Sequence, residues 1–470
     1  MRMRLALVLA ATVVGGCDGG NDDPGSTTSV GVDAGTSADP PVDGSPVGRS
    51  DGSTVDGSAD GSTDGSADGS TVRDGGVAVL PPDDLGAITH SPPITSGHVT
   101  SYGAGGDFRD VSTDASGGIW AVTQVAVYYF AHGAAYSYNQ SNGLARGRST
   151  YDDAYWCQGS TPCPATNPVT FTTVAGGNPG QVFVGNIGFT GDRLDVDPNT
   201  GAVRDVVGME VTSTQQSGEA ELPEQQKREI ATWKAIVDLN GPMNGRAYFG
   251  GFHGLSALSG MNAPMGSRLC GLNCPQYEQH VHPFSSDMST VLGRDIRAIT
   301  LTAAGDLWVG DADSVWFYPQ RSAGPNSDFF QPFGIPGQPS QASVDVFPGV
   351  ADMVYGIGAD AAGGVWVASF GNGLAYLAPK TYAPTRFTAP TGLPQNNLTG
   401  LAIDSNGDIW IGTNSAGVAR YTPSTQTWQY LTTSTGLPSN AIRSVNIDKY
   451  AGNGQWVWFA TGNGAAVYKP

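Results

Sequence analysis

A strand-like phrase built around one aromatic residue recurs seven times in this sequence, and it limits the possible folds more than any other feature. The phrase reads Asp-Leu-Trp-Val-Gly at 306–310 and Asp-Ile-Trp-Ile-Gly at 408–412. The later spacings match the ~40–50-residue length of a β-propeller blade, and the longer earlier spacings indicate blades with insertions. The seven aromatic anchors are Trp120, Phe183, Tyr248, Trp308, Trp366, Trp410 and Trp458.

Each repeat predicts four short strands. In the sixth repeat the side chains of the second strand alternate, with Ile409 and Ile411 on one side and Trp410 on the other. This alternation is typical of a sheet that is buried on both faces. The four strands expected in this repeat, from the inside of the ring outward, are 398–404, 408–413, 417–423 and 427–433.

An Asp-x-x-Gly turn precedes the aromatic anchor in several repeats. Its aspartates could be taken for a ring of carboxylates around a metal ion. A β-hairpin turn needs Asp, Asn and Gly for its positive φ angles, and this need accounts for them without a metal. The aspartates concerned are Asp114, Asp238, Asp360 and Asp404.

The last repeat lacks an outer strand, because the sequence stops after its third strand at 464–470. Residues 98–102 precede the first repeat and have the strand pattern that is missing. Pairing of the two chain ends would leave no free sheet edge in the ring. The expected fold is therefore all-β: a seven-bladed β-propeller over 82–470, closed by an N-terminal strand.

The N-terminus predicts export and a lipid anchor. Arg2 and Arg4 precede an apolar run too short to span a bilayer, as in a signal peptide. The run ends in Val-Gly-Gly-Cys, which is typical of a bacterial lipobox, so 1–16 would be the signal peptide and Cys17 the lipidated residue. The lipid would be the only membrane attachment. We expect a location in the bacterial cell envelope, with the outer membrane or cell surface favoured over the inner membrane.

Residues 17–81 predict a disordered tether. They contain no Phe, Trp or Tyr and repeat Asp-Gly-Ser, so they cannot bury enough apolar surface to offset the entropy of ordering. The whole chain has a net charge of −19. This charge argues against nucleic acid as a partner, since phosphate binding needs a basic face.

The sixth repeat resembles the two-component-regulator propeller repeat. The matching residues are Gly392–Asn396, Asp404–Thr413 and Gly417–Tyr421, and Gly436–Asn440 opens the next repeat. Well-known propellers of this family are extracytoplasmic sensor regions, often concerned with glycans. The resemblance therefore implies a recognition role. The repeats also resemble those of virginiamycin B lyases, but the Trp-Phe-Thr-Glu phrase of those enzymes is absent.

Three insertions between repeats, at 141–168, 208–230 and 334–350, are expected to decorate one face of the ring. Functional residues concentrate in loops held by a rigid scaffold. Tyr and Trp side chains beside carboxylates would suit a sugar or a cationic group. A plain solvated loop is the alternative. The candidate ligand-binding residues are Tyr151, Asp152, Asp153, Tyr155, Trp156 and, near a turn on the same face, His253.

Four further cysteines form two local pairs, Cys157 with Cys163 and Cys270 with Cys274. An even count in an exported domain favours two disulfides. The alternative is a zinc site made by Cys270, Cys274, His280 and His282, although their spacing matches no common zinc pattern.

The predicted function is non-catalytic recognition of a glycan or protein ligand at the cell envelope, with no cofactor and no metal. No nucleophile elbow, zinc-protease motif or phosphate loop is present, so we do not expect an enzyme. The alternatives are a structural subunit of an envelope complex and a lyase or lactonase built on a propeller.

Overall fold

The computed structural model describes eleven segments of the chain, and every structural statement below refers to them. All seven of its β-sheets lie in one compact unit, Thr71–Pro470. The described segments are 93–144, 170–187, 191–209, 232–238, 246–251, 254–258, 296–311, 314–318, 335–336, 343–347 and 354–470.

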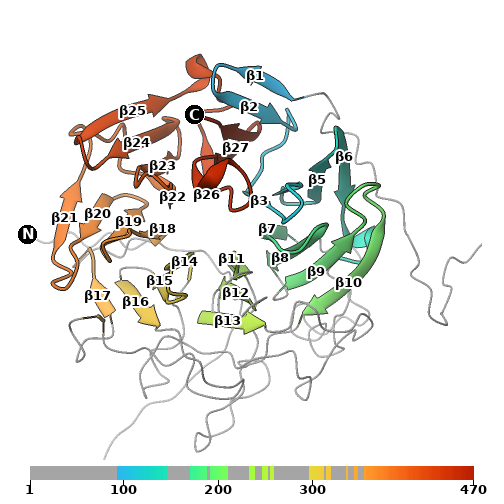
Figure 1. The fold of residues 1–470 in the computed structure, drawn as a ribbon, viewed down its shortest axis with the longest axis horizontal. Helices are drawn as coiled ribbons and strands as arrows, with labels where there is room; N and C mark the ends of the chain where they lie inside the picture. Colours follow the sequence, from blue (N-terminus) through green and yellow to red (C-terminus); the bar gives the residue numbers. More distant parts are fainter. Residues whose placement is uncertain are drawn as a thin grey trace, which may run out of the picture. The chain divides into compact units, whose positions relative to one another are not determined.

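The described residues form seven antiparallel sheets, which we call blades one to seven, and Figure 1 shows them around a central axis. Blade one contains β3 (Asp110–Thr113), β4 (Ile119–Val122), β5 (Val127–Ala131) and β6 (Ala134–Tyr138). Blade two contains β7 (Thr170–Gly176), β8 (Gln181–Ile187), β9 (Gly191–Val196) and β10 (Val203–Met209). Blade three contains β11 (Thr232–Asp238), β12 (Arg246–Gly251) and β13 (Gly254–Leu258).

Blades four to seven complete the ring. Blade four contains β14 (Ala298–Leu301), β15 (Leu307–Gly310), β16 (Ser314–Tyr318) and β17 (Ser343–Asp345), and blade five contains β18 (Val354–Ala359), β19 (Val365–Ser369), β20 (Gly373–Leu377) and β21 (Pro384–Phe387). Blade six contains β22 (Leu398–Ile403), β23 (Ile409–Thr413), β24 (Val418–Thr422) and β25 (Thr427–Leu431). Blade seven contains β26 (Ile442–Ile447), β27 (Val457–Thr461) and β28 (Gly464–Tyr468), together with β2 (Val99–Tyr102) and β1 (Ile94–Ser96).

The helical elements in the described residues are three short 3₁₀ turns, η1 (Gln140–Asn142), η4 (Thr433–Thr435) and η5 (Gly452–Gly454). None of the described helices has the length and apolar character that a membrane crossing requires. The all-β prediction is confirmed, as are the four strands expected in the sixth repeat.

The ring closes through the N-terminal strand, as the sequence predicts. β2 pairs antiparallel with β28, with Val99 opposite Tyr468, so the second described strand and the last strand of the chain belong to the same blade, blade seven (Figure 1). The sequence analysis did not foresee β1, which pairs with β2 and adds an outer fifth strand to this blade.

The innermost strands contact one another in cyclic order, from β3 through β7, β11, β14, β18, β22 and β26 back to β3. Their close approach requires glycine at some positions. A Cβ atom on Gly356 of blade five would lie 2.5 Å from the Leu401 nitrogen of blade six. One on Gly176 of blade two would lie 2.2 Å from the Thr113 oxygen of blade one. Larger residues would therefore push neighbouring blades apart.

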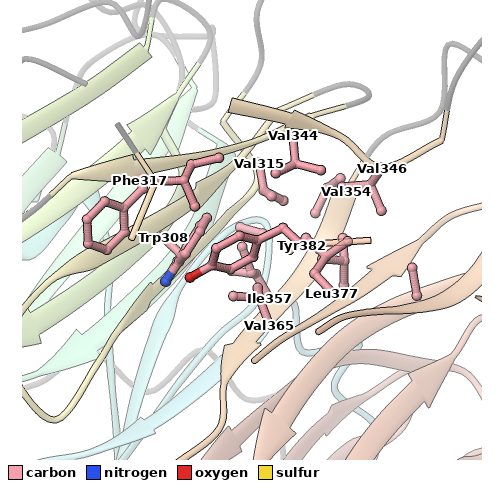
Figure 2. Close-up of a cluster of buried hydrophobic side chains, with 14 of the residues drawn as sticks. Trp308, Val315, Phe317, Val344, Val346, Val354, Ile357, Val365, Leu377 and Tyr382 are labelled. Atoms are coloured by element: carbon pink, nitrogen blue, oxygen red, sulfur yellow. The ribbon is translucent and has the colours of Figure 1, made fainter. Parts of the chain in front are cut away.

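Each blade packs apolar side chains against both of its neighbours. Ile409 and Ile411 join the core cluster that faces blade five, whereas Trp410 joins the cluster that faces blade seven. Figure 2 shows the corresponding core between blades four and five, where Trp308 and Phe317 meet Ile357 and Tyr382. The predicted two-faced burial of the second strand is confirmed.

The turn aspartates bind the hairpin and the aromatic anchor. Asp404 accepts hydrogen bonds from the amides of Asn406 (2.9 Å) and Asp408 (3.0 Å), and from the indole N–H of Trp410 (2.9 Å). The indoles of Trp120 and Trp458 donate in the same way to Asp114 and Asp448, at 3.0 Å each. The turn interpretation of Asp114 and Asp404 is confirmed, because their carboxylates are occupied by these bonds.

One expectation about the insertions is wrong. The segment 334–350 was expected to be wholly a join between blades, but it contains β17, the outer strand of blade four. Val346 and Phe347 follow β17 and are fully buried in the core of Figure 2. Short apolar stretches among Gly, Pro and Gln hid this strand. The proposed signal peptide, Cys17 and the tether lie outside the described residues.

We predict that Val99→Asp destabilises the ring far more than Ile94→Asp. Val99 of β2 is 1% exposed and packs in the core, whereas Ile94 of β1 is 63% exposed. A charge buried without a partner should lower the free energy of unfolding by at least about 3 kcal/mol, and the exposed change by less than ~0.5 kcal/mol. Chemical denaturation of both variants measures the difference. Equal losses would show that β2 does not close the ring.

Candidate functional site

A cavity of about 570 Å³ lies among the inner strands of the seven blades. Residues of β3, β7, β11, β14, β18, β22 and β26 all line it, so it lies at the centre of the ring that these inner strands form. A cavity of this size is in the range of small-molecule sites.

The charge of the cavity lining is opposite to that of the chain. The chain as a whole carries a net charge of −19. Among the described residues, the lining has Asp110 as its carboxylate and five cationic side chains. These are Arg109, Lys234, Arg297, Arg443 and Lys449.

A β-bulge brings one side chain from each of five inner strands to the same end of the cavity. The strand register shifts at Thr172, Trp233, Tyr355, Thr399 and Arg443. A bulge re-aims a side chain relative to the regular alternation of the strand. Each of the five is half-buried and lines the cavity, and all but Trp233 lie between two buried neighbours.

The other two blades place arginines at the equivalent positions. Arg109 and Asp110 both lie opposite Val122, because the Arg109 amide donates to the Val122 carbonyl at 2.6 Å. Arg297 occupies the same place immediately before β14. We call the resulting set of seven the mouth ring. It consists of Arg109, Thr172, Trp233, Arg297, Tyr355, Thr399 and Arg443, all of which line the cavity.

Aromatic faces hold the guanidinium of Arg297. Its carbon lies 4.2 Å from the Trp233 ring centroid and 5.4 Å from that of Tyr355. These rings come from blades three and five, which flank the Arg297 blade. Stacking on aromatic faces restricts the guanidinium without consuming its N–H donors.

On the far side of the mouth ring, Asp107 links Arg443 and Arg109. The Arg443 Nε lies 3.0 Å from Asp107 Oδ1, and an Arg109 Nη2 lies 3.6 Å from Asp107 Oδ2. The Asp107 side chain is 44% exposed, so these pairs are screened by water and contribute little to stability. Arg109 Nε and Thr399 Oγ1 are buried and have no hydrogen-bond partner among the described residues.

Deeper in the cavity, Asp110 joins three blades through a polar network. Its carboxylate accepts from Lys234 Nζ at 3.1 Å, Thr173 Oγ1 at 2.6 Å and Asn446 Nδ2 at 2.9 Å. Burial raises the pKa of Asp110. The charge of Lys234 and the hydrogen bonds from Thr173, Ser444 and Lys234 together lower it by more than burial raises it, so the pKa lies below its usual value. The carboxylate therefore stays ionised and engaged.

Lys449 lies at the opposite end of β26 from the mouth ring and donates to the Val237 carbonyl at 3.0 Å. Surrounding protein lowers its pKa by desolvation, although the charge of Asp238 acts in the other direction. The side chain is nevertheless exposed to water, as expected for a group in an open channel.

The residues proposed from the sequence lie outside the described part of the chain. They are Tyr151, Asp152, Asp153, Tyr155, Trp156 and His253, with Cys157, Cys163, Cys270, Cys274, His280 and His282. Among the described residues, no cluster of three or more His, Cys, Asp or Glu side chains could hold a metal ion. Both proposals about these residues stay predictions.

The mouth ring was not predicted from the sequence, although a signal for it was present. Arg109, Trp233, Tyr355, Thr399 and Arg443 each lie five residues before the aspartate of the following turn. The same offset from Gly177 and Thr302, which occupy the equivalent turn positions, finds Thr172 and Arg297. Because their identities differ from blade to blade, they do not look like a motif in the one-dimensional sequence.

We predict that Asp110→Asn lowers the free energy of unfolding by about 2–4 kcal/mol at pH 7, because it leaves Lys234 without its counter-charge. The folded-state pKa of Asp110 lies below its ordinary value of about 4, so the stabilisation is complete above pH ~4. It should be lost as the pH falls through the folded-state pKa. Urea unfolding at pH 7 and pH 3 measures this. Asp107→Asn is the control, with a small expected effect. A difference between Asp110→Asn and the parent that does not shrink at pH 3 would contradict the prediction.

Three solved structures are similar to this chain in fold. They are an extracellular domain described as part of a one-component system, BT4673 from B. thetaiotaomicron (15% identity, 81% of this chain, 40% of that chain, TM-score 0.44); virginiamycin B lyase from Staphylococcus aureus (12%, 83%, 98%, 0.45); and the WD40 β-propeller domain of Doa1 (10%, 79%, 95%, 0.44). The match thus spans about 40% of the first structure.

A search of curated protein sequences finds no significant match. A family model described as two component regulator propeller matches residues 392–415. These residues include β22 and β23, the two inner strands of blade six. The chain therefore carries the two-component-regulator propeller repeat, in a ring of antiparallel blades.

Proposed function

We propose that this protein is a recognition module of the bacterial cell envelope, which binds a glycan or protein ligand without converting it. The observation that carries the proposal is the mouth ring. Seven blades each place one half-buried side chain at the same end of a cavity of about 570 Å³. Two of the seven are aromatic, three are arginines and two are threonines, a combination of apolar faces and hydrogen-bond donors typical of ligand sites.

The chemistry around Asp110 supports binding over catalysis. General acid–base catalysis needs a group that can exchange a proton near neutral pH. Asp110 is the carboxylate of the described lining, and its lowered pKa keeps it ionised. Lys234, Thr173 and Asn446 occupy its oxygens. These groups hold the inner strands together, so they position the site.

The proposed location follows from the N-terminal sequence. Lipidation of Cys17 would attach the chain to a membrane, and 17–81 would act as a flexible tether with a mean reach of about 40–45 Å. Such a tether would keep the propeller clear of the membrane surface and free to meet a ligand. We favour the outer membrane or cell surface over the inner membrane.

We predict that a ligand of this site raises the thermal stability of the exported, oxidised protein and is recovered unchanged. At about a hundred times its Kd, a ligand should add about 2.7 kcal/mol to the folded state. Differential scanning fluorimetry against oligosaccharides, lactones and divalent cations detects this stabilisation. Mass spectrometry of the recovered ligand then detects any conversion.

Two matched variants locate the site. Tyr355→Ala removes an aromatic ring from the mouth ring, whereas Tyr430→Ala removes an exposed ring from β25 on the outer edge of blade six. We expect the first to weaken binding and the second to leave it unchanged. Conversion of the ligand would replace this proposal with the lyase or lactonase alternative. A flat response to every compound, together with a stable complex with another envelope protein, would favour the structural-subunit alternative.

A further inference from the structure

We propose that the mouth-ring end of the cavity binds an oxyanion group, such as a carboxylate, phosphate or sulfate, carried by a small molecule. The three arginines of the ring, Arg109, Arg297 and Arg443, would contact this group. The inference rests on the proposed function and deepens it, because it names the chemical class of the ligand.

The lining of the cavity is positively charged. Cations outnumber carboxylates in the described lining by five to one, on a chain whose net charge is −19. An acidic protein gains no general affinity for anions from its surface. A cavity with low-dielectric walls and one sign of charge focuses the field within it. The positive lining therefore creates local attraction for an anion against the charge of the whole molecule.

The guanidinium of Arg297 is held between two aromatic rings. Trp233 and Tyr355 fix its guanidinium from two sides, at 4.2 and 5.4 Å from their ring centroids. A planar guanidinium presents a fork of N–H donors that matches the two oxygens of a carboxylate or phosphate. Because the aromatic faces already restrict this side chain, less conformational entropy is lost when an anion binds. The arrangement suits an oxyanion better than a neutral hydroxyl group.

Two further arginines of the mouth ring lie beside a single carboxylate, that of Asp107. Arg443 and Arg109 share this one carboxylate, so a positive charge remains at the pair. Arg109 also has a buried Nε with no hydrogen-bond partner among the described residues. A buried donor without a partner costs free energy, and a bound acceptor would recover it. Asp107 competes with any anion that approaches these two arginines.

The two remaining cations of the lining have different roles. Lys234 is paired with Asp110. Arg443 lies near the start of β26 and Lys449 follows its end, so the length of the strand, roughly 13 Å, separates them. The site we propose is therefore the arginine end of the cavity alone.

Isothermal titration of the full, exported protein tests the proposal with probes that share one hexose ring. They are glucose, glucuronate, its uncharged methyl ester, glucose 6-phosphate and glucose 6-sulfate, supplemented by citrate, inorganic phosphate and sulfate. Ionic strength is held constant. We expect at least one anion to bind, its neutral counterpart to bind at least about tenfold more weakly, and added salt to weaken the binding. The pattern across the probes distinguishes a carboxylate from a phosphate or sulfate ligand.

Two variants change the affinity in opposite directions. Arg297→Gln keeps hydrogen-bond donors but removes the charge, and should weaken anion binding by about tenfold or more. Asp107→Asn removes the competing carboxylate at a half-exposed position, and should tighten anion binding by roughly two- to tenfold. A gain in affinity cannot come from a misfolded protein, so the second variant keeps the test valid if the first is unstable.

Failure of this inference differs from failure of the proposed function. Neutral ligands that bind as tightly as anions, with no effect of Arg297→Gln or Asp107→Asn, would overturn the oxyanion site and leave the recognition role standing. Absence of binding by every anion would also overturn it. Conversion of a bound probe would overturn the recognition role while the oxyanion site could stand.

Discussion

A sheet with apolar side chains on both faces must be covered on both sides, and this constraint governs the structure. The second strand of blade six sends Ile409 and Ile411 toward one neighbour and Trp410 toward the other. No blade can satisfy this requirement alone, so blades stack until the last meets the first. The pairing of β2 with β28 completes the final blade and closes the ring. The central cavity is a consequence of that closure.

The inner strands combine close packing between blades with β-bulges that direct side chains into the cavity. Glycine at Gly356 and Gly176 allows neighbouring inner strands to approach closely. One bulge near the start of several of these strands then turns a single side chain into the cavity. A rigid scaffold thus holds seven independently variable positions. These positions can therefore differ from blade to blade without changing the packing between blades.

The polar groups of the inner strands divide into a set that holds turns and strands together and a set that lines the cavity. Asp114, Asp404 and Asp448 are fully engaged by their turns and by Trp indoles. Asp110 with Lys234 and Asn446 ties blades one, three and seven together. The mouth ring carries the arginines and aromatic side chains that face the cavity. This division explains why an aspartate-rich repeat surrounds a positively charged centre.

The local and periodic features of the fold follow from the amino-acid sequence alone. These include the seven aromatic anchors, the four strands of blade six, the turn role of Asp404 and the closing strand at 98–102, because each depends on side-chain alternation or turn chemistry within a few residues. The sequence did not reveal β1 of blade seven, β17 as the outer strand of blade four, or the mouth ring. Arg109, Arg297 and Arg443 are far apart in the chain, and the offset from the turn that they share does not show that they meet. Only closure of the ring brings them to one cavity, since the bulges and the approach of the inner strands are decided by packing between blades.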